Sequence, residues 1–558
     1  MVGGRRSILS PGYGLALLLG GLLAGLTVLA YWPGMQAGFY FDDLVNIVDA
    51  PALHWKEWSA AGVRRVVEEA TMPTRVLANL SFALNHLYGG LDPSGYHWTN
   101  LVIHLLVGAA LLWVAVLLGA QGSRCVVKPE QRLLFALPAV SLFLLHPLNI
   151  QAVTYAVQRM TALAALFVLL ALGCYISARV RHGRRAAAWF AAAGICWLLA
   201  LGNKETAVAL PLVLLIYEAC FFPACWKERI RHLSRRLGRL RLVGLIVGAA
   251  ALAGAVAGQL YYTPDLIRWN ELLPGRDFTG LQRVLTEARV QFFYLSLLLW
   301  PAPSRLNLDH DFGLSVSLFQ PWTTAVAVAG WLGVAAATLW LARRHPRYGF
   351  PLLGYGVFHL LESGPINLEL VFEHRMYLPM AFLAFPITNL LLDCRRGRRL
   401  ILGGLALLLI PLSAATFERN QTWSEPLVFL RDCAAKSPDK FRPWYNLGTE
   451  LGKAGQLAEA ERALSRALAV RPDHSMAHNQ LGNVYLLMGR RQQALVHYQK
   501  AVQHDPDNLE AMFNLAVEYD ARGEGREAVR LFRQFVESAP PYYEEARRRA
   551  QLRLRALR

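Results

Sequence analysis

The chain of 558 residues is 54% hydrophobic and only 17% charged, with a mean hydropathy of +0.29. This composition excludes an ordinary soluble globular protein and is typical of an integral membrane protein. The formal net charge of +18 would favour a nucleic-acid partner in a soluble protein, but the basic residues lie in short loops between apolar runs. Such loops predict a positive-inside membrane topology, so no nucleic-acid partner is expected. The seven cysteines are scattered, and Cys220 and Cys225 lack histidine partners, so neither a zinc site nor a disulfide framework is expected.

The first apolar run, from Leu15 to Trp32, follows Arg5 and Arg6. The run is long enough to span a bilayer, and no small-residue cleavage pattern follows it, so we expect an uncleaved helix that starts in the cytoplasm. Further apolar runs lie at 99–119, 132–146, 153–178, 186–202, 206–224 and 241–260. Alternating spans place the loops 120–131, 179–185 and 225–241 in the cytoplasm, and all three loops are basic.

The run at 284–300 is a poorer candidate for a span because it contains Glu287 and Arg289 and ends at two prolines. If it crossed the membrane, the basic stretch 343–345 would lie outside, against the charge bias. We therefore expect a re-entrant or interfacial segment here. Spans at 322–342, 349–361, 376–393 and 399–416 complete a set of about eleven, with the N-terminus inside and the C-terminus outside.

From about residue 440 the chain becomes polar and repeats with a period of 34 residues. The period is marked by Pro438, Pro472, Pro506 and Pro540, by Leu447, Leu481 and Leu515, and by Ala460, Ala494 and Ala528. This pattern predicts tetratricopeptide repeats at 440–473, 474–507 and 508–541, followed by a C-terminal helix. Stacked helix pairs of this kind form a concave face for an extended peptide, while a scaffold or oligomerisation module is the alternative.

The first external loop, at 33–98, opens with the sequence Phe41-Asp42-Asp43. Crowded or buried carboxylates have raised pKa values and act as general bases, or they hold a cation. A solvated turn is the alternative for these two residues taken alone.

The expected topology places further polar residues on the same side of the membrane as this loop. They are His146, Gln158, Arg159, Lys204, Glu205, Glu373, His374 and Arg375. Ionisable residues in membrane segments are costly and usually functional. Each has a structural alternative by itself, such as snorkelling for Arg159 or helix termination for Lys204 and Glu205. Their common level nevertheless predicts a shared polar cavity.

A helix is predicted from Pro73 to Leu87, and it carries Arg75 near its start. In the second span, His97, Asn100 and His104 share one helical face by their three-and-four spacing. Two histidines seven residues apart are poorly placed for one metal ion. We therefore expect hydrogen-bonded core packing for His104 and leave the role of His97 open.

Seven stretches of the chain together resemble a known family. They are Phe41-Asp42-Asp43, Arg75 to Asn85, Tyr96 to His104, Leu145 to Val153, Gln158-Arg159, Lys204-Glu205-Thr206 and Glu373 to Pro379. With the C-terminal repeats, they resemble the transmembrane and tetratricopeptide-repeat O-mannosyltransferases and their bacterial relatives, which are integral-membrane (C-type) glycosyltransferases. The resemblance covers essentially the whole chain. One departure is Arg75-Val76-Leu77, where the family often has Arg-Pro-Leu.

The resemblance implies a sugar donor carried on polyprenyl phosphate, used on the non-cytoplasmic face, and a protein acceptor bound by the repeats. It implies that Asp42 or Asp43, with Asp42 preferred, acts as the base or orients the acceptor hydroxyl. Cations should stabilise the leaving phosphate. The candidates for this role are Arg159, Lys204 and Arg375, with His146 and His374 as secondary donors and Glu205, Glu373, Arg75 and His97 as further site residues. The chemistry requires no metal or cofactor, although a divalent cation held by Asp42 and Asp43 is an alternative.

We therefore expect an all-α chain, with a polytopic membrane domain at 1–418, a half-repeat linker at 419–439 and an α-solenoid of tetratricopeptide repeats at 440–558. A composition rich in Ala, Leu and Arg favours a bacterial inner membrane with periplasmic repeats, whereas the same topology in a eukaryote would place the repeats in the endoplasmic reticulum lumen. A non-catalytic membrane-anchored scaffold and a transferase with a lipid or glycan acceptor remain open. A transporter would need polar residues through the membrane midplane, and the sequence does not show them. Neither the sugar nor the acceptor can be identified.

Overall fold

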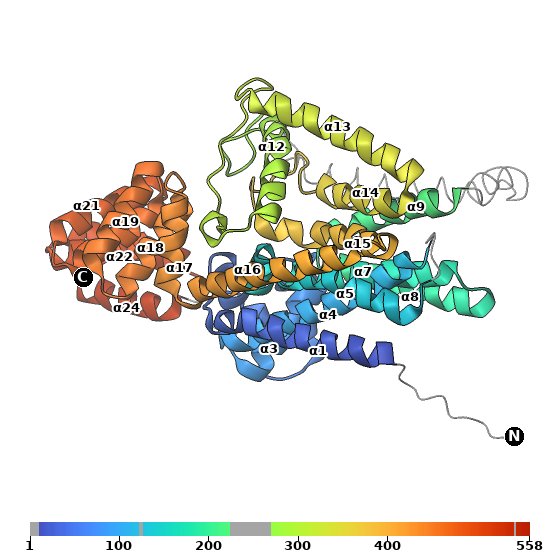
Figure 1. Cartoon of the computed structure of the whole chain (residues 1–558). Helices are drawn as coiled ribbons and strands as arrows, with labels where there is room; N and C mark the ends of the chain where they lie inside the picture. The colour runs from blue at the N-terminus through green and yellow to red at the C-terminus, as the bar shows by residue number, and fades with distance from the viewer. Residues whose placement is uncertain (1–10, 122–126, 224–268, 541–542, 558) are drawn as a thin grey trace, which may run out of the picture. The chain divides into compact units, whose positions relative to one another are not determined.

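The computed structural model describes residues 11–121, 127–223, 269–540 and 543–557 (Figure 1). Within these ranges the elements are helices and two isolated β-bridges, without a β-strand. The basic start of the chain, the loop 225–241 and the predicted span at 241–260 lie outside the described residues. The chain forms two compact units, one of residues 1–308 and 312–424, the other of residues 309–311 and 425–558. The first is called the membrane unit below, and the second the repeat unit.

The membrane unit is built from long apolar helices and from shorter helices that join them. The long helices are α1 (Pro11–Tyr31), α4 (Pro93–Gly119), α5 (Pro129–Leu144), α7 (Arg159–Arg179), α8 (Gly183–Leu201), α12 (Gly280–Leu299), α13 (Thr323–Arg344), α15 (Tyr377–Asp393) and α16 (Arg398–Ser424). The shorter ones are α2 (Ala60–Glu69), α3 (Val76–Gly89), α6 (Ile150–Val153), α9 (Leu210–Phe221) and α14 (Pro346–Leu360).

Seven of the described helices are long and apolar enough to cross a membrane, or up to eight if the bent pair of α5 with 147–153 counts as one span. The expected number was about eleven. Every predicted span in the described ranges does lie on a helix, but α9 and α14 have only 12 and 15 residues. At 1.5 Å per residue, helices of this length fall short of a hydrocarbon core of about 30 Å. Helix α12 is not among the seven, in keeping with the expected interfacial or re-entrant segment.

The centre of the membrane unit is formed by α4, α7 and α15. Most of α7 and α15 is buried inside the protein, whereas less than a fifth of the apolar window is buried in each of α1, α8, α13 and α16. Small residues allow the close packing at the centre: a Cβ atom at Gly173 of α7 would lie 2.4 Å from the Trp113 ring of α4. Glycine at such a position lets two membrane helices approach closely. The exposed helices form a lipid-facing periphery.

Helix ends define the two levels of the membrane unit. The ends marked by Gln121, Val180, Phe222, Arg347 and Asp393 line one cavity of about 810 Å³. The alternating spans place these five ends on the predicted cytoplasmic side. The starts of α7 and α15, the turn before α9 and the end of α14 meet around a different, polar cluster (described below).

The repeat unit is a series of helix pairs that follows α17 (Pro426–Lys436). The pairs are α18 (Phe441–Lys453) with α19 (Leu457–Val470), α20 (Ser475–Leu487) with α21 (Arg491–His504), and α22 (Leu509–Ala521) with α23 (Gly525–Ser538). Helix α24 (Glu544–Ala556) follows. Gly455, Gly489 and Gly523, also 34 residues apart, have positive φ values of 73°, 76° and 77° at the turn inside each pair. The predicted repeats are thus present as three helix pairs. The unit begins at 425, because the first residues of the expected linker at 419–439 continue α16.

We predict that Gly482→Ala destabilises the repeat unit by about 1–3 kcal/mol, because overpacking a close helix contact forces neighbouring atoms to move. A Cβ atom at Gly482 would lie 2.6 Å from the Tyr498 ring. Thermal unfolding of the purified full chain measures the effect. Gly452→Ala is the matched control, because its Cβ atom would make an ordinary contact, 3.5 Å from Val484. Equal melting temperatures for the two variants would show that the Gly482 contact is not tight.

Candidate active site

The aspartate loop, residues 38–49, follows α1 and contacts the segment that leads into α7. Asp43 is fully buried, and its two carboxylate oxygens accept the backbone N–H groups of Tyr40 at 3.1 Å and Val157 at 2.7 Å. Burial raises the pKa of Asp43 to about 8, although these two hydrogen bonds oppose the rise. Asp43 therefore holds the loop against the start of α7.

Asp42 has a different environment from its neighbour. Its side chain is half-buried, and its backbone N–H donates to the hydroxyl of Tyr155 at 2.7 Å. Phe41, just before it, has a φ of 47°, in the left-handed region that costs a bulky residue about 1–3 kcal/mol. The hydrogen bonds accepted by Asp43 and the bond from the Asp42 N–H to the Tyr155 hydroxyl hold this conformation in place. Asp42 is thus the more accessible carboxylate of the pair, whereas both oxygens of Asp43 accept backbone N–H groups.

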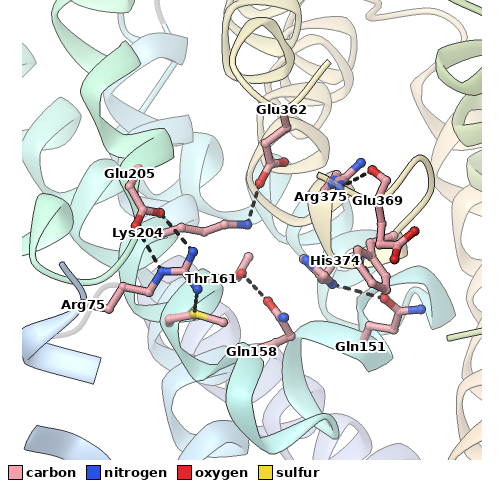
Figure 2. A network of polar contacts seen from close by, with 12 residues as sticks. Arg75, Gln151, Gln158, Thr161, Lys204, Glu205, Glu362, Glu369, His374 and Arg375 are labelled. Carbon is pink, nitrogen blue, oxygen red and sulfur yellow. Dashed lines mark hydrogen bonds and ion pairs between the residues drawn. The ribbon is translucent and has the colours of Figure 1, made fainter. Parts of the chain in front are cut away.

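The polar cluster is formed by residues at the start of α7, between α8 and α9, after α14 and before α15 (Figure 2). Lys204, in the turn before α9, forms an ion pair of 2.6 Å with Glu362, which follows α14. Both side chains are about nine tenths buried. They line a narrow cavity of about 10 Å³ together with Thr161, His374 and Arg375. Burial raises the pKa of Glu362, but Lys204 and Arg375 outweigh it and hold the pKa below its ordinary value. The cavity wall thus carries two cations and one carboxylate.

A second group of charges supports one side of this cavity. Glu287 of α12 lies between Arg283, at 3.0 Å, and Arg375, at 3.5 Å. The two arginines also donate to backbone carbonyls of the segment 362–370. The segment that joins α14 to α15 is therefore fastened to α12 by buried arginines.

Further hydrogen bonds border the cavity on either side, as Figure 2 shows for Arg75 and Gln151. Arg75 forms a bidentate pair with Glu205, 3.2 Å at each oxygen, and Glu205 is exposed. Gln151 accepts from the His374 ring and backbone at 3.3 Å. Its amide nitrogen donates to the carbonyl of Asn307, whose own N–H donates to Glu373. Glu373 and His374 are consequently part of one buried hydrogen-bond network. The ion pair between Arg75 and Glu205 lies closer to the protein surface.

Three predicted site residues, Arg159, His146 and His97, form hydrogen bonds to other parts of the protein and do not line this cavity. Arg159 is fully buried, and its three nitrogens donate to Asn100, Ser81 and Tyr96 while its guanidinium lies over the Phe82 ring. His146 uses both ring nitrogens, one toward the carbonyl of Leu298 and one toward the N–H of Leu148. His97 is buried and donates to the carbonyl of Ala37. Because these polar atoms already bind protein groups, the geometry does not add support to the prediction that Arg159 and His146 bind the donor phosphate. The core role expected for His104 is confirmed, since its ring bonds Tyr377 and the carbonyl of Leu144.

Sequence reasoning missed Glu362, Arg283 and the role of Glu287. Glu287 and Arg283 do carry a signal, because charged residues four apart in an otherwise apolar helix form one buried face. Glu362 carries none, because it lies in a Ser-Gly-Pro turn where a carboxylate is unremarkable. Among the described residues there is no group of three His, Cys, Asp or Glu side chains arranged for a metal ion.

Comparison with known proteins identifies homologues along most of the chain. Tetratricopeptide-repeat models match residues 441–474 and 475–508. Protein O-mannosyl-transferase Tmtc3 of Drosophila melanogaster is 25% identical, over 92% of this chain and 63% of that protein. The human Protein O-mannosyl-transferase TMTC3 is 22% identical over 96% and 62%. Protein O-mannosyl-transferase tmtc2 of Xenopus laevis is 33% identical, but over only 42% and 27%. The chain thus spans less than two thirds of the length of these relatives, and it is homologous to proteins named protein O-mannosyl-transferases.

We predict that Asp43→Asn lowers stability by about 1–3 kcal/mol, because an amide accepts only one of the two N–H groups and leaves the other unsatisfied. Thermal unfolding of the detergent-purified protein measures this loss. Asp42→Asn is the matched control and should lower the melting temperature less. The assignment of the two roles would be reversed if Asp42→Asn were the more destabilising variant.

Arg159→Lys is likewise expected to lower the melting temperature, with a cost of about 2–4 kcal/mol, because one ammonium cannot replace a planar guanidinium that binds three separate groups. Arg181→Lys, at an exposed arginine near the other end of the same helix, is the control. A lysine variant that melts like the wild type but no longer binds a lipid phosphate would support the phosphate-binding role.

Proposed function

We propose that this relative of the TMTC protein O-mannosyl-transferases transfers a sugar from a polyprenyl-phosphate donor to a hydroxyl group of a protein. The observation that carries the proposal is the convergence of Lys204, Arg375 and His374 on one buried cavity. Thr161 of α7 lines the same cavity, and the aspartate loop is hydrogen-bonded to Val157, about one helical turn away. The loop that carries the proposed base, Asp42, is thus attached through Asp43 close to the helix that lines the cationic cavity.

In the proposed reaction, the carboxylate of Asp42 accepts the proton of the acceptor hydroxyl as its oxygen attacks the anomeric carbon. The bond between that carbon and the phosphate oxygen breaks, and the electron pair leaves with the polyprenyl phosphate. Lys204 and Arg375 stabilise the developing negative charge, which is worth most in a buried site. Attack opposite the leaving group inverts the anomeric centre. No metal ion has a part in these steps.

We place this reaction on the non-cytoplasmic face, with the chain as an integral membrane protein, as in a bacterial inner membrane. Support comes from the basic loops and helix ends around the cavity of about 810 Å³, at the opposite ends of the membrane helices. Arg343 and Arg344 end α13, and Arg395, Arg396 and Arg398 lie between α15 and α16 or at its start. Basic residues in short loops mark the cytoplasmic side. The repeats would then bind the acceptor on the same side as the aspartate loop.

Asp42→Asn is expected to lower transfer by about 10²–10⁴-fold, the usual contribution of a general base. Purified full-length protein is offered radiolabelled polyprenyl-phosphate sugars with a pool of external proteins, and label on protein is counted. Asp49→Asn, an exposed carboxylate of the same loop, is the matched control and should transfer like the wild type.

The same assay separates the competing functions. Label on lipid or glycan would retain the enzyme and overturn the protein acceptor. Wild-type behaviour of cells that carry Asp42→Asn, combined with a defect on removal of the repeats, would favour a scaffold and contradict the proposed transferase.

A further inference from the structure

The ion pair between Lys204 and Glu362 joins two parts of the chain that are far apart in sequence. Lys204 lies in the turn between α8 and α9, and Glu362 lies just after α14. Among the described residues, Glu362 is the partner in the one ion pair that Lys204 forms. The pair therefore links the two walls of the cavity that we assign to the donor phosphate.

The size of this cavity limits what can enter while the pair is formed. Its volume of about 10 Å³ is close to the minimum that holds a single water molecule. A phosphate group is larger than water, so the walls must separate before it reaches Lys204. Parting the carboxylate of Glu362 from the ammonium of Lys204 would open this space and expose a cation.

Charge gives a second reason for the two groups to part. The phosphodiester of a polyprenyl-phosphate sugar carries one negative charge, as does the carboxylate of Glu362. Two anions on one buried ammonium repel each other strongly in a site of low dielectric. Exchange of one anion for the other keeps the charge of the Lys204 ammonium balanced. Glu362 also lies within electrostatic range of Arg375 and Arg283, so other cations are near it when it leaves Lys204.

We propose that Glu362 is an exchangeable counter-anion of Lys204, which closes the cavity until the donor phosphate takes its place. This inference rests on the proposed function, because the ligand is the lipid phosphate of that reaction. After transfer the product is a phosphate monoester, which carries more negative charge than the donor. The return of Glu362 to Lys204 then favours release of the product. Glu362 is a positioning residue, since it acts through Lys204.

The test measures binding of polyprenyl monophosphate, with uncharged polyprenol as the reference lipid, to the full chain in nanodiscs. Glu362→Gln should bind the lipid phosphate about tenfold more tightly, since a competing charge is removed at nearly constant size. Lys204→Gln should bind it at least about tenfold more weakly, and the double variant should behave like Lys204→Gln, because both effects act through one ammonium.

Glu218→Gln is the matched control for the loss of a buried carboxylate. Glu218 pairs with Arg179 at the other level of the membrane unit, with both side chains about nine tenths buried. We expect its affinity for polyprenyl monophosphate to equal that of the wild type. In transfer assays, Glu362→Gln should lower both KM for the donor and kcat, because the product leaves more slowly.

The binding experiment distinguishes a failure of this inference from a failure of the proposed function. Equal or weaker binding by Glu362→Gln, with a melting temperature like that of Glu218→Gln, would show that Glu362 is only a structural partner and would overturn this inference alone. A wild-type protein that does not distinguish the lipid phosphate from polyprenol would overturn the donor class, and the inference with it.

Discussion

The buried carboxylate of Glu287 is the interaction on which the cationic side of the site depends. It is 2% exposed and lies between the guanidinium groups of Arg283 and Arg375. An isolated charge at this depth would be strongly destabilising, and removal of one partner would leave the others uncompensated. The same arginines satisfy backbone carbonyls in the segment 362–370, which forms no helix of its own there. Glu287 therefore fixes the arginines, and the arginines fix the segment that carries Glu362 and leads to His374.

The position of the cluster within the fold explains how so many charges are tolerated. Among the seven candidate spans, α4, α7 and α15 are the most buried, and the residues of the cluster come just before or at the starts of α7 and α15. Polar groups at these helix starts are thus removed from water but remain near unpaired backbone donors and acceptors, which they satisfy. Arg159 is an example of such a polar group. It joins the start of α7 to α3 and α4 by hydrogen bonds and does not line the cavity. The low dielectric around such a cluster strengthens the electrostatic interactions of every charged group that does face the cavity.

Much of the fold could be predicted because its signals are periodic. Apolar runs located the helices, and the 34-residue period located the repeats. The apolar runs also predicted the interruption after residue 146 and the short span at 349–361, whereas α9 is shorter than the run at 206–224 because residues 205–209 form a separate 3-10 turn. For the site, the common level of Lys204, His374 and Arg375 was predictable from alternating spans. A cation at a helix start looks the same in sequence whether it faces a ligand or a neighbouring carbonyl, so the sequence could not show that Arg159 and His146 bind protein groups. Glu362 was missed because its partner comes from a turn over 150 residues earlier.

The arrangement of charges also bears on the choice between an enzyme and an anchor. Each cation near the cavity is matched by a carboxylate: Arg75 by Glu205, Lys204 by Glu362, and Arg375 by Glu287. A scaffold has no need for these pairs, because well-packed apolar residues at the same positions would be as stable or more so. A site for an anionic substrate does need them, since its cations must stay charged and oriented when no anion is bound. Of the three pairs, only the one between Lys204 and Glu362 has both of its members in the cavity wall.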